Sequence, residues 1–82
     1  MHEFSLATEV IKLAEFEAGK HKTLAVSEIT IEVGNFSGVD AEALESALSL
    51  ISEGSILEKT QLNFVKTDGK EFRVVSMIIE EE

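Results

Sequence analysis

The segment from Ser27 to Val33 alternates strictly between two kinds of side chain. One face carries Ser27, Ile29, Ile31 and Val33, and the other carries Glu28, Thr30 and Glu32. A period of two is typical of a β-strand with one buried face and one face in water. Because such a strand is not stable alone, the rest of the chain has to cover its apolar face.

Two segments have the helical period that could provide this cover. The first begins after Ser5, a good N-cap, ends near Gly19, and places apolar residues on one side: Leu6, Ala7, Val10, Ile11, Leu13, Ala14 and Ala18. Phe16 falls off this stripe. The second is predicted over residues 41–53, between an Asp40 N-cap and a Gly54 C-cap, with a stripe of Leu44, Ala47, Leu48 and Ile51.

Two further strands are predicted over residues 61–66 and 71–80, separated by the letters TDGK. Asp-Gly suits a tight type I′ turn, so these strands are expected to form a hairpin. The chain contains no proline, repeat or low-complexity linker. We therefore expect one domain over residues 1–82.

The expected fold is of the α/β type, in two layers (α+β), with the order helix, strand, helix, strand, strand. The first strand, second helix and second strand form a right-handed crossover, which makes those two strands parallel. Because the letters EFRVVSMII are apolar on both faces, the last strand is predicted to be central, antiparallel to both neighbours. Both helices then cover one face of a three-stranded mixed sheet.

This arrangement leaves an apolar patch on the open face of the sheet, formed by Val65, Val75, Met77 and Ile79. Small monomers rarely expose such a patch. It is either a surface for a homodimer or another partner, or it is covered by loops or by the chain terminus.

Composition excludes several classes of function. Seven basic and sixteen acidic residues give a net charge of −9, which disfavours nucleic acid as a partner. The apolar runs are too short to span a membrane, and no signal peptide precedes the first helix, so a soluble protein starting at Met1 is expected. The lack of cysteine excludes disulfides and thiolate zinc sites and agrees with a cytoplasmic location. No nucleophile, paired-carboxylate or phosphate-loop pattern suggests an enzyme.

The first three residues, Met1, His2 and Glu3, form a candidate metal site. A terminal amine, the next amide nitrogen and a second-position imidazole can close adjacent chelate rings on one cation. The amide of Glu3 is a further donor, and its carboxylate could act from outside the ligand set or contact a partner. Nitrogen donors in a plane suit Ni(II) or Cu(II). Taken alone, however, the same letters could be an ordinary N-terminal tail.

Three long stretches resemble the HypA/HybF family of hydrogenase maturation proteins: MHEFSLATEVIKLAEFEAGKH, VSEITIEVGNFSGVDAEALESAL and GSILEKTQLNF. The initial MHE with SL after it, and the run GNFSGVDAEAL, are the most specific pieces. GKEFRVVSMIIEE is similar to the family's closing strand. The resemblance implies nickel binding by His2 and the neighbouring backbone of Met1 and Glu3. It also implies delivery, with a partner GTPase, to the large subunit of nickel–iron hydrogenase and sometimes to urease.

One departure from the family pattern stands between the last two strands. Members usually carry there a zinc domain with two Cys-x-x-Cys pairs, where this sequence has KTDGK. The chain is either a natural short homologue or a deletion of the zinc domain, and structural zinc is not expected. His21, after the first helix, is interpreted as a surface histidine, with a replacement role in nickel binding as the alternative.

Two functions remain open. The first is a metallochaperone that carries nickel at Met1, His2 and Glu3. The second is an interaction module that docks on a maturation GTPase or a hydrogenase subunit without metal. A nickel titration on protein with a free Met1 amine distinguishes them.

Overall fold

The computed structural model describes residues 2–20 and 25–80. Within these ranges the chain forms α1 (His2–Lys20), β1 (Ala25–Gly34), α2 (Ala41–Ile51), β2 (Gln61–Thr67) and β3 (Phe72–Glu80). This is the predicted order of elements. One boundary differs clearly, because α1 begins at His2 and not after Ser5.

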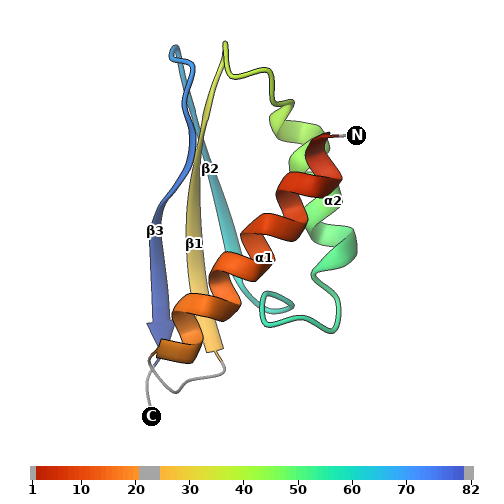
Figure 1. Ribbon diagram of the computed structural model, residues 1–82, viewed down its shortest axis with the longest axis vertical. Coiled ribbons are helices and arrows are strands. Elements are labelled where there is room, and N and C mark those ends of the chain that lie inside the picture. Colours follow the sequence, from red (N-terminus) through yellow and green to blue (C-terminus); the bar gives the residue numbers. More distant parts are fainter. Residues whose placement is uncertain (1, 21–24, 81–82) are drawn as a thin grey trace.

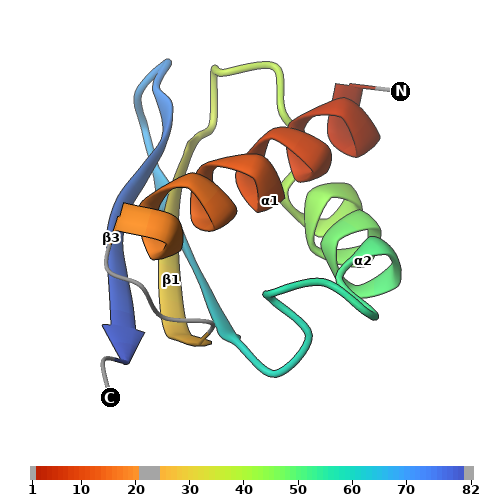
Figure 2. The same cartoon turned by 60° about the horizontal axis from the view of Figure 1, so that its bottom comes forward.

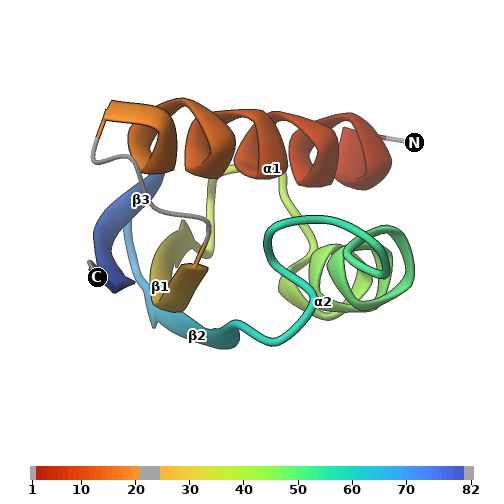
Figure 3. The same cartoon turned by 90° about the horizontal axis from the view of Figure 1, so that it is seen from below.

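Across the described residues, the strands form one mixed sheet in the order β2-β1-β3, with α1 and α2 together on one side of it (Figures 1 and 3). β1 runs parallel to β2 and antiparallel to β3. The predicted fold class is therefore confirmed, including the two helices on one face. The prediction that the last strand is central is wrong, because β1 occupies that place.

The charged face of β1 is compatible with this strand order. Asn63 on β2 donates to the Glu28 carboxylate at 2.5 Å, and Arg73 on β3 donates to the Glu32 carboxylate at 2.8 Å. Polar side chains of β1 thus find partners on both neighbouring strands, so one wet face does not prevent a strand from being central. An edge strand such as β3 can in turn be largely apolar in sequence.

The segment between β2 and β3 is consequently not a hairpin turn. Since β1 lies between the two strands, residues 68–71 cross over its end. Gly34 donates its backbone N–H to Glu71 O at 2.8 Å, and Phe36 donates to Gly69 O at 2.9 Å. The prediction of a type I′ hairpin is therefore wrong. The Asp-Gly pair lies in a connection that is bonded to the end of β1 and to the loop after it.

The core lies between the sheet and the helices, and Figure 2 shows α1 crossing over the sheet beside α2. The buried residues of α1 are small: Ala7, Val10, Ala14 and Ala18. They meet the larger buried side chains of α2, β1 and the loop after α2: Leu44, Leu48, Leu57, Val26, Ile29, Ile31 and Val33. The predicted stripes are mostly confirmed, although Leu13 is 39% exposed.

The predicted apolar patch on the open face is only half present. Val65 and Val75 are exposed, at 45% and 44%. Met77 and Ile79 pack instead against the core. The cause is an irregularity in the β1–β3 register, where Thr30 pairs with Ser76 and Ile31 with Val74, so that Val75 is an extra residue. This bulge turns Met77 and Ile79 inward.

Candidate metal centre

The candidate site is at the start of α1. Because the helix begins at His2, the backbone N–H groups of His2 and Glu3 lie in its first turn. The first four N–H groups of an α-helix have no carbonyl partner within the helix. Two of the nitrogen donors expected from the sequence are therefore not used by helical hydrogen bonds.

Glu3 joins this first turn to the start of α2. Its Oε2 accepts a hydrogen bond from the backbone N–H of Asp40 at 3.2 Å. The Asp40 N–H and, to a smaller extent, the N–H of Glu3 itself lower the pKa of the Glu3 carboxyl. A lowered folded-state pKa means that this contact favours folding at neutral pH. That contribution is lost in acid, as the carboxylate becomes protonated.

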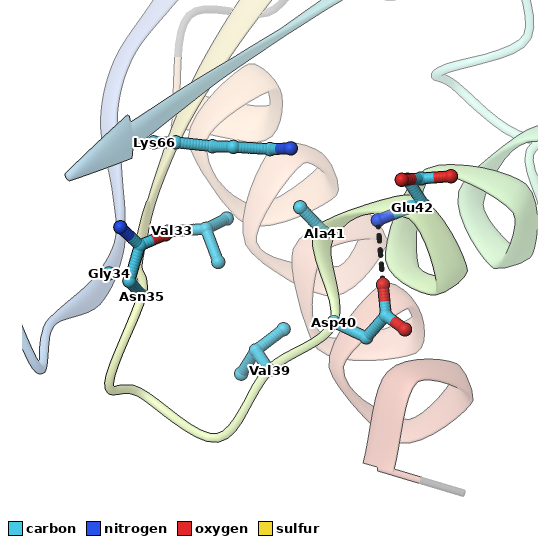
Figure 4. Close-up of a pocket in the computed structure, with 8 residues that line it drawn as sticks. All are labelled: Val33, Gly34, Asn35, Val39, Asp40, Ala41, Glu42 and Lys66. Carbon is cyan, nitrogen blue, oxygen red and sulfur yellow. Dashed lines mark hydrogen bonds between the residues drawn. The ribbon is translucent and has the colours of Figure 1, made fainter. Parts of the chain in front are cut away.

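Asp40 makes hydrogen bonds with its backbone N–H, its carbonyl oxygen and one carboxylate oxygen. Its Oδ1 accepts from the N–H of Glu42 at 3.0 Å (Figure 4). It also accepts from the N–H of Ala43 at 3.2 Å, so that Asp40 is the N-cap of α2. Its carbonyl accepts from Leu44 N–H at 2.9 Å. The sequence indicated the N-cap but carried no signal for the contact with Glu3, which depends on how the two helices are placed.

A pocket of about 140 Å³ lies behind this N-cap, between the end of β1 and the start of α2 (Figure 4). Val33, Gly34, Val39, Asp40 and Lys66 are among the residues that line it. An ammonium group and a helix N-terminus both favour anions. The Asp40 and Glu42 carboxylates oppose this preference, so the lining combines both signs of charge.

Of the three predicted metal residues, only Glu3 has its side chain in the described part of the chain. His2 is described as the first residue of α1, while its imidazole, Met1 and His21 lie outside it. Among the described residues, no three His, Cys, Asp or Glu side chains gather closely enough to hold a metal ion. Within the same residues, no helix has the length and apolar character needed to cross a membrane.

Comparison with known proteins gives a consistent result. The family model described as "Hydrogenase/urease nickel incorporation, metallochaperone, hypA" matches residues 1–77. A hydrogenase maturation factor HypA from Parabacteroides distasonis is 35% identical over 72 residues, which cover 85% of this chain and 63% of the relative. The HypA proteins of Francisella philomiragia and Methanothermobacter thermautotrophicus are 37% and 35% identical, and the matches cover 79% and 77% of this chain.

The chain spans only part of these relatives: 57% of the Francisella protein and 52% of the Methanothermobacter protein. Two solved structures share its fold. The nickel metallochaperone HypA from Helicobacter pylori superposes with a TM-score of 0.86 at 19% identity, covering 98% of each chain. A second HypA solution structure gives 0.82 at 21% identity, covering 100% of this chain and 98% of the other. From the family match over nearly its whole length, this chain belongs to the HypA family.

Proposed function

We propose that this protein is a nickel-binding metallochaperone for hydrogenase maturation, and that it holds Ni(II) through Met1, His2 and Glu3. The observation that carries the proposal is the start of α1 at His2, which leaves the amide nitrogens of His2 and Glu3 without helical partners. They are adjacent in sequence to the Met1 amine and the His2 imidazole. The family description, which names nickel incorporation, supports the same cargo.

The donors fit nickel better than the hard cations. The Met1 amine, the His2 amide nitrogen and the His2 imidazole can lie in one plane with a metal, as Ni(II) and Cu(II) prefer, whereas Mg²⁺ and Ca²⁺ take oxygen ligands. The positive end of the helix dipole also helps an amide nitrogen to lose its proton to solvent. The deprotonated His2 amide then offsets part of the charge of the metal.

A carrier also has to release its cargo. Binding requires a neutral imidazole and a neutral terminal amine, groups with ordinary pKa values of about 6.5 and about 7.7–8.0. Protons compete with the metal at every donor, so mild acid or a competing ligand removes it. We propose that the recipients are the maturation GTPase and the hydrogenase large subunit. The site would bind and release nickel without breaking any bond of a substrate.

The test is a calorimetric nickel titration at neutral pH, on protein with a free Met1 amine. His2→Ala should abolish binding, because it removes the imidazole, while circular dichroism shows an unchanged fold. One extra residue before Met1 should also abolish it, because the amine is moved out of the chelate. His21→Ala is the matched control and should bind like the wild type. Equal affinity in all four proteins would reject the nickel site and favour a metal-free interaction module.

A further inference from the structure

We infer that the Glu3 carboxylate is a positioning group for the nickel site, and that it acts by fastening the first turn of α1 to the N-cap of α2. This inference rests on the proposed function and assigns the carboxylate a role outside the ligand set. The backbone nitrogen of Glu3 stays among the proposed ligands.

The first turn needs such a fastening because little else holds it. Phe4 and Ser5 are exposed, the next residue, Leu6, packs partly buried against the core, and Ala7 is the first residue of α1 that is fully buried. Within the described residues, the hydrogen bond from Asp40 N–H to Glu3 Oε2 is the one that joins this turn to another element. Without it, the end of the helix is free to fray, as helix ends do.

Asp40 is a suitable anchor because its hydrogen bonds connect it to the first turn of α2. Its carboxylate caps α2 through Glu42 and Ala43, and its carbonyl accepts the first helical bond from Leu44. A site is held accurately when the groups that support it are themselves fixed. The hydrogen bond between Glu3 and Asp40 therefore restricts the movement of the first turn of α1, which contains the amides of His2 and Glu3.

The same geometry argues against the Glu3 carboxylate as a ligand. In an α-helix side chains point back toward the N-terminus, yet the Glu3 carboxylate is already directed to Asp40, on a different element. This bond occupies Oε2, so the carboxylate would reach a metal held by the terminal nitrogens only through its other oxygen or by giving up the bond. The Met1 amine, the His2 amide nitrogen and the His2 imidazole close their chelate rings without the carboxylate, so that exchange is not needed.

Two substitutions separate positioning from ligation, since both keep the backbone amide. Glu3→Gln retains an acceptor oxygen at the same reach, and Glu3→Ala removes it. Nickel affinity should fall about threefold to tenfold in Glu3→Ala, the effect of one lost hydrogen bond, and stay within about twofold of the wild type in Glu3→Gln. Glu9→Ala is the control, since Glu9 is an exposed residue of the same helix whose ion pair with Lys12 spans 3.8 Å.

Two further measurements make the test specific. The visible absorption of the Ni(II) complex reports the donor set and should be unchanged in both Glu3 variants. In metal-free protein, hydrogen exchange at the Asp40 amide should be slow in the wild type and in Glu3→Gln, and faster in Glu3→Ala. Equal losses of affinity in both variants, a shifted spectrum in either, or unchanged exchange in Glu3→Ala would overturn the inference. Failure of His2→Ala to lose nickel would instead reject the proposed function itself.

Discussion

At the scale of single residues, Gly34 is the position where the fold depends most on a missing side chain. It ends β1 beneath the crossing connection, and a Cβ atom built there would lie 2.2 Å from the backbone oxygen of Gly69. Backbone cannot rotate away as a side chain can. At Gly69 the nearest atom, also 2.2 Å away, is the end of the flexible Glu71 side chain. The two glycines therefore differ in their tolerance of a methyl group.

Gly34→Ala should destabilise the protein by about 1–3 kcal/mol, because the crossing connection must shift to admit the new atom. Gly69→Ala should cost less than about 1 kcal/mol in the same urea denaturation, since the Glu71 side chain can rotate aside. Gly19→Ala, in a helix and with nothing within 4 Å, should stabilise by about 0.5–1 kcal/mol. Equal costs at Gly34 and Gly69 would show that the connection adapts freely.

At the scale of elements, α1 is fitted to the core by small residues. Ala7, Ala14 and Ala18 are buried with at most 1% exposure, and they face large aliphatic side chains of the sheet and of α2. Close packing leaves little space for additional methylene groups. The sequence of this stripe thus sets how near the helix lies to its neighbours, and with it the position of the first turn.

Ala14→Leu should therefore destabilise the fold by about 1–3 kcal/mol despite the higher hydrophobicity of leucine. Glu15→Leu, the same new side chain at the next and exposed position, should change the stability by less than about 0.5 kcal/mol. Thermal unfolding followed by circular dichroism measures both. A neutral Ala14→Leu variant would mean that α1 can move away from the core without cost.

At the scale of the whole molecule, the open face of the sheet is more polar than the sequence predicted. Its central strand presents Glu28, Thr30 and Glu32 between Val65 on one edge strand and Val75 on the other. The two valines are thus separated by a row of polar groups. Ile78, 51% exposed, lies opposite Glu28 and does not join them into one patch.

We therefore expect the two halves of the predicted partner surface to respond differently to polar substitution. Val65→Ser with Val75→Ser should leave the stability within about 1 kcal/mol and the sedimentation mass unchanged at high concentration. Met77→Ser should destabilise the monomer by about 1–3 kcal/mol, because this side chain packs against the core. A mass that falls from dimer to monomer in the double valine variant would restore the open face as an association surface.

Much of this protein could be predicted from local patterns. The alternation from Ser27 to Val33 and the periods of the two helices indicated the elements and most of the core, because each face repeats within a few residues. Asp40 was recognisable as an N-cap from its place before a helical stripe. The MHE letters indicated a nitrogen chelate because adjacent residues carry its donors, whatever the fold.

Only the tertiary structure decided three features that depend on distant residues. β1 is central although one of its faces is charged, and Asn63 and Arg73 provide partners for its charges from both sides. Met77 and Ile79 face inward because Val75 is an extra residue in the pairing of β3 with β1, which shifts the alternation of β3 by one residue. Glu3 meets Asp40 because the small side chains of α1 let the two helices begin at the same corner. Local periodicity cannot encode these features, since each is set by pairing between segments far apart in the chain.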